Sequence, residues 1–308
     1  MSDQLLKFLF HRAPVRGEVV RLEQAWQRMV QFHHYPAPVT QLLGEMTAAA
    51  ALLAANIKFS GTLELQIQGD GPVRLLVVEC RPDLPDLNLR ATAKLRDAAA
   101  IPAEATLAQL VDVHGNGRCA ITLDPRERGQ QPYQGIVSLH GNSIAQALEN
   151  YMRQSEQLDT RLWLAADARV ASGVLLQKLP QDGGKAASSP QAQDDDAWGR
   201  AAMLASTLSA AELLATPPET LVRRLFWQEQ LQHAPPLAPR FACTCSRERI
   251  GRMLLSLGRG EVNSIVAEQG RVEVTCDFCN AKQAFDAVDI GQLFATGSTD
   301  EAAVDRPH

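Results

Sequence analysis

Four cysteines in the last quarter of the chain stand as two close pairs that could bind one metal ion. Cys243 and Cys245 are separated by one residue, and Cys276 and Cys279 by two. Zn²⁺ prefers a tetrahedron of sulfur ligands, and a Cys-x₁₋₂-Cys turn lets one short loop supply two of them. The same pairs are short enough to close as disulfides, so zinc thiolate and disulfide are alternative states of the same atoms. We predict a structural or regulatory zinc site, with one ion per chain, at these four residues.

A disulfide framework or a chance clustering would be the other explanation for the pairs. A secreted framework would need an export signal, and the stretch from Met1 to Lys7 lacks a basic region leading into an apolar core. The longest run of small apolar residues, from Ala48 to Ala55, is about half the length that a transmembrane helix requires. We therefore expect a cytoplasmic protein, without a membrane partner, whose thiols stay reduced.

Length and composition limit the class of protein. A chain of 308 residues that is 45% hydrophobic can bury a large core and is expected to form more than one domain. The net charge of −5 gives no global attraction to phosphate backbones, and an aromatic content of 5% argues against stacking platforms for single-stranded nucleic acid. Nucleic acid is therefore not an expected partner.

The first 180 residues alternate between strand and helix patterns. Strands are predicted at 62–67, 73–78, 118–123, 134–139, 162–165 and 174–179, and helices at 22–32, 40–57 and 143–155, the last capped by Ser143. The sequence Gly69-Asp70-Gly71-Pro72 is interpreted as a hairpin turn rather than a phosphate-binding loop. Cys80 and Cys119 end or interrupt strand patterns and are predicted to be small apolar core residues. We predict an α+β domain with a mostly antiparallel sheet over residues 1–180.

Composition changes abruptly after Pro180. The next segment is rich in Gly, Ala, Ser and Asp and cannot bury enough apolar surface to order itself. Amphipathic helical patterns follow, with capping boxes predicted at Ser209-x-x-Glu212 and at Thr216-Pro217-Pro218-Glu219. We expect residues 181–240 to form a flexible helical linker or hinge of low intrinsic stability, although an ordinary helical subdomain packed on the core fits the same pattern.

The cysteine region offers little apolar material. A helix is predicted from Ser246 to Gly258, Val272 and Val274 alternate into the second cysteine pair, and Phe285 lies on an expected return strand. We predict a small zinc-binding domain over residues 241–308, with a frayed tail, that is marginal without its metal.

Motifs throughout the chain resemble one known family. They are Val15-Arg16-Gly17-Glu18, Gln68-Gly69-Asp70-Gly71-Pro72, Ser155-Glu156-Gln157-Leu158 followed by Thr160-Arg161-Leu162, Cys243-Thr244-Cys245-Ser246-Arg247-Glu248-Arg249 and Cys276-Asp277-Phe278-Cys279. Together they resemble the redox-regulated 33 kDa heat-shock chaperone family of bacteria.

The resemblance implies a function and a set of site residues. Cys243, Cys245, Cys276 and Cys279 would be the zinc thiolates, and oxidation would pair Cys243 with Cys245 and Cys276 with Cys279. The family acts in oxidative stress as an ATP-independent holdase that binds unfolded proteins, is inactive when reduced and zinc-loaded, and tends to form a homodimer when oxidised. The linker would unfold and bind aggregation-prone clients, which links the chain to protein refolding.

Two other classes of function are open. A zinc-ribbon nucleic-acid-binding protein would use Arg247, Arg249, Arg252 and Arg259 as phosphate contacts, although nearby acidic residues dilute that charge. An enzyme is not expected, because four thiolates close the coordination shell that a catalytic zinc keeps open. No Gly-x-x-x-x-Gly-Lys-Ser/Thr loop and no Gly-x-Ser-x-Gly elbow are present, so we predict no catalytic residues.

Overall fold

The computed structural model describes residues 3–57, 60–99, 101–126, 129–139, 141–180, 194 and 196–301. The chain divides into two compact units, Met1–Ala242 and Cys243–His308. Most of the Gly- and Ser-rich segment after Pro180 and the predicted frayed end at 302–308 lie outside the described residues. The three-part division with a separate linker at 181–240 stays a prediction.

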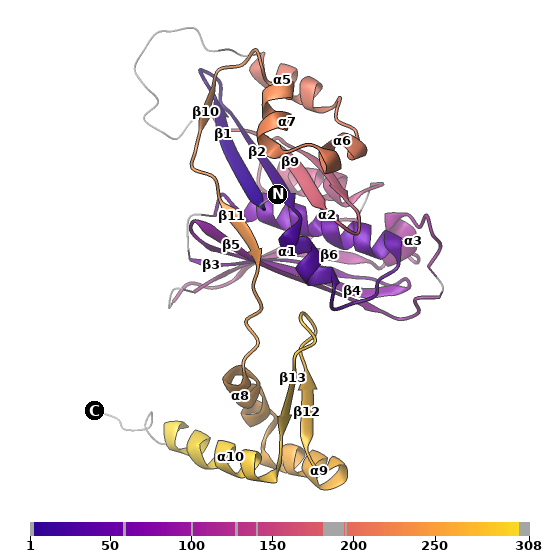
Figure 1. Cartoon of the computed structure of the whole chain (residues 1–308), viewed down its shortest axis with the longest axis vertical. Helices are drawn as coiled ribbons and strands as arrows, with labels where there is room; N and C mark the ends of the chain where they lie inside the picture. The colour runs from indigo at the N-terminus through magenta and orange to yellow at the C-terminus, as the bar shows by residue number, and fades with distance from the viewer. Residues whose placement is uncertain are drawn as a thin grey trace, which may run out of the picture. The chain divides into compact units, whose positions relative to one another are not determined.

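Two sheets form the frame of the first unit (Figure 1). The first sheet has the order β10 (Leu231–His233), β1 (Gln4–Phe10), β2 (Val15–Leu22), β9 (Ala171–Lys178) and β8 (Thr160–Ala166). The second has the order β11 (Ala238–Phe241), β5 (Asp86–Leu95), β4 (Val73–Asp83), β3 (Gly61–Gln68), β6 (Arg118–Pro125) and β7 (Tyr133–Val137). Neighbouring strands are antiparallel except β11 and β5, which are parallel. The predicted α+β fold with mostly antiparallel sheet is confirmed.

Helix α2 (Ala37–Ala54) lies between the sheets and contacts strands of both. Its length and apolar composition would also suit a membrane span, but 78% of that window is buried inside the protein. A helix covered on both sides needs apolar residues all round, which explains its composition. Cys80 and Cys119 are fully buried in the same core, and burial raises the pKa of both thiols. Their prediction as core residues is confirmed.

Local predictions in this unit are partly confirmed. The hairpin of β3 and β4 and the cap of α4 (Ile144–Gln154) by Ser143 are present. The turn between the hairpin strands is held by Asp70, whose carboxylate accepts the backbone N–H groups of His114 at 3.0 Å and Asn116 at 2.9 Å. The predicted helix at 22–32 begins too early, because Leu22 still belongs to β2 and α1 is Gln24–Val30. Strands β1, β2 and β5 and the short helix α3 (Leu107–Val111) were not predicted.

Three short helices cover the opposite face of the first sheet from α2. They are α5 (Ala197–Ala205), α6 (Ala210–Ala215) and α7 (Pro218–Leu225). Their apolar faces join a second core with β1, β2 and β9, in which the Phe226 ring lies 5.7 Å from that of Phe8 and 5.2 Å from that of Phe10. Ser209 caps α6 as predicted, accepting the N–H of Glu212 at 3.1 Å.

The predicted cap at Thr216 is wrong. Thr216 is extended, and α7 begins at Pro218 with Pro217 as its N-cap and without a side-chain cap bond. A residue that precedes proline is disfavoured in the helical region, and proline is well suited to the first helical position. Two consecutive prolines therefore move the start of the helix past the threonine.

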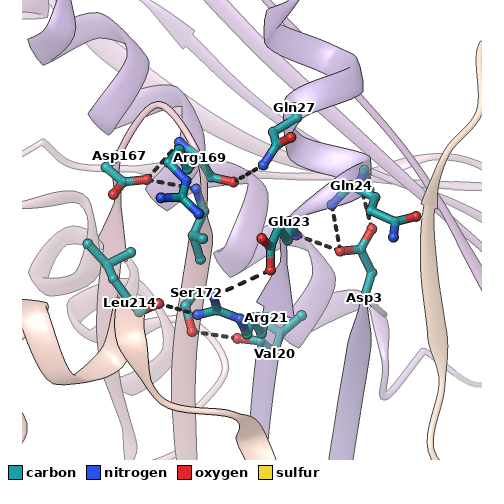
Figure 2. A network of polar contacts seen from close by, with 12 residues as sticks. Asp3, Val20, Arg21, Glu23, Gln24, Gln27, Asp167, Arg169, Ser172 and Leu214 are labelled. Carbon is teal, nitrogen blue, oxygen red and sulfur yellow. Dashed lines mark hydrogen bonds and ion pairs between the residues drawn. The ribbon is translucent and has the colours of Figure 1, made fainter. Parts of the chain in front are cut away.

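One buried arginine ties α6 to the sheet (Figure 2). Arg21 projects from β2 with its side chain 10% exposed, and it donates to the carbonyl oxygen of Leu214 in α6. A second guanidinium nitrogen lies 3.5 Å from the Glu23 carboxylate. A cation at the C-terminal end of a helix also meets the negative end of the helix dipole. Arg21 thus adds a directional contact to an otherwise apolar interface.

The second unit is smaller. It contains α8 (Arg247–Leu257), α9 (Arg259–Gln269), β12 (Val272–Thr275), β13 (Lys282–Phe285) and α10 (Ala287–Glu301). The helix starting at Ser246 and the strands at Val272 and Phe285 are confirmed, and Gly258 takes a positive φ of 90° at the end of α8, where glycine is favoured. Helices α9 and α10 were not predicted.

A buried carboxylate lies where α2 ends against the first sheet. Glu18 on β2 is 1% exposed and accepts a hydrogen bond from Asn56. Lys7 on β1 donates to the carbonyl oxygen of Ala55 at 2.6 Å, and its charge and that of Arg16 favour the ionised carboxylate. Burial outweighs these contacts and raises the pKa of Glu18 from 4.5 to about 7.

We predict that Glu18→Gln removes part of the pH dependence of stability. The folded state holds the Glu18 proton more tightly than the unfolded state, so its contribution to the free energy of unfolding falls as pH rises from about 4.5 through about 7. At pH 8 the variant should be more stable than the parent by on the order of 1 to 3 kcal/mol, and the difference should vanish near pH 4.

All four tryptophans belong to the first unit, so urea unfolding followed by tryptophan fluorescence measures this effect. The exposed Glu104, changed to glutamine, is the matched control and should leave the pH profile unchanged. Parallel pH profiles for the parent and Glu18→Gln would contradict the prediction.

Candidate metal centre

Each cysteine pair sits in a loop whose backbone is fixed by its neighbours. Cys243 and Cys245 precede α8, whose N-cap Ser246 accepts the N–H of Arg249 at 3.2 Å. Arg249 in turn donates to the hydroxyl of Thr244, between the two cysteines, at 2.8 Å. We call residues 243–245 the first knuckle.

The second knuckle, residues 276–279, is the turn that joins β12 to β13. The N–H of Cys276 donates to the carbonyl of Ala281 at 2.9 Å, and the N–H of Asn280 donates to the carbonyl of Cys276 at 2.9 Å. Asn280 has a positive φ of 54°, which asparagine tolerates better than most residues. Cys276 and Cys279 therefore both lie in the tight loop at the end of this hairpin.

The four sulfur atoms converge. All lie within 4.8 Å of one another, with Cys243 and Cys276 separated by 3.6 Å and Cys245 and Cys279 by 3.4 Å. A tetrahedron with Zn–S bonds of about 2.3 Å has sulfur atoms about 3.8 Å apart, whereas a disulfide bond is only about 2.05 Å long. All four cysteines are free thiols. The spacing and the donor atoms fit one four-coordinate ion.

Nothing else in the described ranges competes as a metal site, because no other place brings three or more His, Cys, Asp or Glu ligand atoms together. The structure thus brings together all four cysteines that the sequence indicated. Cys80 and Cys119 belong to the core of the other unit.

Cys243, Cys245 and Cys279 have shifted pKa values. Partial burial opposes ionisation of Cys243, but the backbone N–H of Cys245 and neighbouring thiols stabilise its thiolate, and its pKa is lowered. Burial raises the pKa of Cys245, and the Cys279 and Cys243 sulfurs raise it further. Burial also raises the pKa of Cys279. Of these three thiols, Cys243 is the one that ionises most readily, because its negative sulfur discourages ionisation of Cys245 and Cys279 beside it.

Three of the four arginines considered as phosphate contacts, Arg247, Arg249 and Arg259, make contacts within the unit. Arg247 donates to the carbonyl of Ala284 and pairs with Asp289, each at 2.7 Å, and Arg249 holds Thr244. The guanidinium of Arg259 lies 6.0 Å from the ring centre of Phe294. Asp289 and the helix that carries it were not predicted, although Asp286-x-x-Asp289 has the spacing of a helix-start box.

Comparisons with known proteins identify one family. The family model described as "Hsp33 protein" matches residues 3–286. A 33 kDa chaperonin of Methylobacillus flagellatus is 47% identical over 297 residues, covering 96% of each chain, and one of Ectopseudomonas mendocina is 46% identical over the full length of both. The crystal structure of a 33 kDa chaperonin (heat shock protein 33 homolog) from Thermotoga maritima superposes with a TM-score of 0.75 at 20% identity, covering 96% of this chain and 99% of that one.

The family assignment rests on the full-length identity to the 33 kDa chaperonins and on the extent of the family match. The crystal structure supports the fold. The chain belongs to the Hsp33 family of chaperones.

Proposed function

We propose that this chaperone is an ATP-independent holdase that oxidation activates through its four-cysteine site. The observation that carries the proposal is the convergence of four thiols within 4.8 Å in a unit with a small apolar core. Cys243, Cys245, Cys276 and Cys279 are the proposed zinc ligands of the reduced protein, one ion per chain. Its proposed place of action is the cytoplasm, where thiols stay reduced until stress.

Zinc would supply most of the stability of the second unit. Among the residues of this unit whose burial the structure describes, 243–295, six apolar residues form the buried core: Ile250, Leu254, Val262, Val272, Phe285 and Ile290. A structural zinc contributes roughly 10 to 16 kcal/mol to the folding of a small site at neutral pH, as much as the net stability of a whole domain. Removing the thiolates that hold the ion should therefore unfold the unit.

Oxidation removes these ligands. Two thiolates lose two electrons to hypochlorous acid, which is reduced to chloride and hydroxide, and one S–S bond forms. We propose the pairs Cys243 with Cys245 and Cys276 with Cys279. The sulfur contacts of 3.6 Å and 3.4 Å join the two knuckles. The second unit nevertheless loosens as its ligands are consumed, and partners within one short loop stay close while the knuckles separate.

Helices α5 to α7 are the proposed client-binding part. They have six to nine residues each, too few to be stable alone, so they depend on the apolar face of the first sheet. Strands β10 and β11 connect α7 to Cys243, so these helices lie just before the metal-binding unit along the chain. We propose that unfolding of the second unit weakens the docking of α5 to α7, while β10 and β11 keep them tethered to the sheets. Released helices would expose Phe8, Phe10 and their own apolar faces to unfolded proteins. Homodimer formation in the oxidised state is part of the proposal.

The structure gives reasons to prefer this function to its rivals. Phosphate binding would compete with the internal contacts of Arg247, Arg249 and Arg259, which disfavours the nucleic-acid-binding alternative. A zinc ion held by four thiolates would have no open position for a substrate, which disfavours an enzyme.

The first functional prediction concerns the metal site. Elemental analysis of the reduced protein should find one zinc ion per chain, and serine at all four ligand positions should abolish binding and unfold the second unit, seen as rapid proteolysis after Ala242. Cys119→Ala removes a buried thiol outside the cluster and should keep the metal. A reduced parent protein without bound metal, or a four-serine variant as protease-resistant as the parent, would refute the site.

Oxidation should couple zinc release to chaperone activity. Hypochlorous acid is added to the zinc-loaded protein while a chelating dye records free zinc and light scattering records aggregation of an unfolded test protein. Zinc should appear first and suppression of aggregation should follow, without ATP, and dithiothreitol should reverse the suppression. Zinc release without any suppression would refute the holdase.

Arg21→Met should activate the reduced protein. The change removes a buried contact that holds α6 on the sheet, at a cost in docking free energy of roughly 1 to 3 kcal/mol. We expect suppression of aggregation without oxidant while the zinc content stays at one ion per chain. Arg28→Met, on the exposed face of α1, is the control and should stay inactive. If the Arg21→Met protein is as inactive as the control, docking of α6 does not control chaperone activity.

A further inference from the structure

We propose that Arg247 is a positioning residue of the metal centre, which holds the two cysteine knuckles in register through contacts that do not pass through the metal. The inference rests on the proposed zinc site and adds a residue that is not a ligand. It concerns how tightly the site binds its ion.

Arg247 occupies the first turn of α8, two residues after Cys245, and reaches across to the other half of the unit. One guanidinium nitrogen donates to the carbonyl oxygen of Ala284 at 2.7 Å, and the other lies 2.7 Å from a carboxylate oxygen of Asp289. The guanidinium carbon lies 4.2 Å from the ring centre of Phe285, a core residue that is 3% exposed. The planar group is therefore fixed by a carbonyl, a carboxylate and an aromatic face.

Two of the residues that Arg247 contacts, Ala284 and Phe285, belong to the hairpin that carries the second knuckle. Ala284 and Phe285 end β13, and they pair with Glu273 and Val272 on β12. The same ladder continues to Thr275 and Lys282, next to the turn that carries Cys276 and Cys279. A contact at the open end of this short hairpin thus fixes the direction of the turn at its other end.

Asp289 is itself held in place at the start of α10. Its carboxylate accepts the N–H of Asp286 at 3.1 Å, and its own N–H donates to the Asp286 carboxylate at 2.8 Å. The bond from Arg247 lowers the pKa of Asp289, so the carboxylate stays ionised at neutral pH. Arg247 therefore binds a partner whose position is already set by the helix cap.

The first knuckle is attached to the same turn of α8 from the other side. Ser246 caps the helix, and Arg249 donates to Thr244 between Cys243 and Cys245. The first turn of α8 is thus the common support of both knuckles: local bonds fix the first, and Arg247 fixes the second.

Such a support should act mainly on metal affinity. The Arg247 and Asp289 side chains are 43% and 36% exposed, and ion pairs this exposed contribute little to folding stability. Bringing four thiolates from two segments into one tetrahedron nevertheless requires the segments to be ordered, and residues that pre-order ligands change metal affinity by about 10 to 100-fold. Without Arg247, metal binding has to order the knuckles itself.

The test measures the dissociation constant for zinc of the reduced, full-length protein by competition with a chelating dye. Arg247→Met should weaken binding at least tenfold, and Arg247→Lys should weaken it less, because lysine keeps one donor but loses the fork and the planar stacking. Asp289→Asn should have a smaller effect, and combining it with Arg247→Met should add nothing, because the pair is already broken. Arg252→Met removes an exposed arginine of the same helix and should leave the affinity within twofold of the parent.

The possible outcomes are distinguishable. If the parent binds no zinc, the proposed metal site itself fails. If the parent binds zinc and Arg247→Met keeps the same affinity, Arg247 is not a positioning residue. The same conclusion follows if the effects of Asp289→Asn and Arg247→Met on zinc affinity are fully additive. A general loss of folding is recognised by circular dichroism at saturating zinc, and the Lys and Asn variants then decide the question.

Discussion

The mutual approach of four sulfur atoms is the main constraint on the second unit, which has little else to hold it. In the described part of this unit, six buried apolar side chains and a short hairpin form the core, and the ion pairs of Arg247 and Arg271 are at the surface. The first unit is the opposite case, with a continuous core between two sheets and a long apolar helix. One chain thus combines a unit with a large apolar core and a unit with a small one, and we propose that folding of the smaller unit is linked to metal binding and thiol chemistry.

Helices pack on both faces of the first sheet, and the packing is tighter on one face than on the other. Helix α2 covers one face with an almost fully buried, alanine-rich surface that is close-packed. Three short helices cover the other face. Met203 in α5 is 71% exposed, and Trp227, just after α7, is 73% exposed. Local opening begins where packing is thinnest, so the second face is the one suited to conditional exposure. The buried Arg21 bond to Leu214 is a specific contact on that weaker face.

Features set by neighbouring residues could be predicted from the sequence. The cysteine spacing indicated the metal centre, the alternation at Leu63 to Ile67 indicated the hairpin, and Ser143 and Ser246 marked helix starts that the structure confirms. Features set by partners far along the chain could not. Strand β2 alternates poorly because both of its faces are buried, and the pairing of Arg247 with Asp289 joins residues on different helices. At Thr216 the local rule failed because a capping pattern was followed by two prolines.

The path of the chain after α7 bears on how a released segment would behave. Strand β10 pairs with β1 at the edge of the first sheet, Leu237 exchanges backbone hydrogen bonds with Leu5, and β11 pairs with β5 at the edge of the second sheet. Helices α5 to α7 are therefore tethered at both ends, by β9 before them and by these strands after them. A loop tethered in this way keeps a high effective concentration over its docking surface, so return to the resting state is an intramolecular search that is independent of protein concentration.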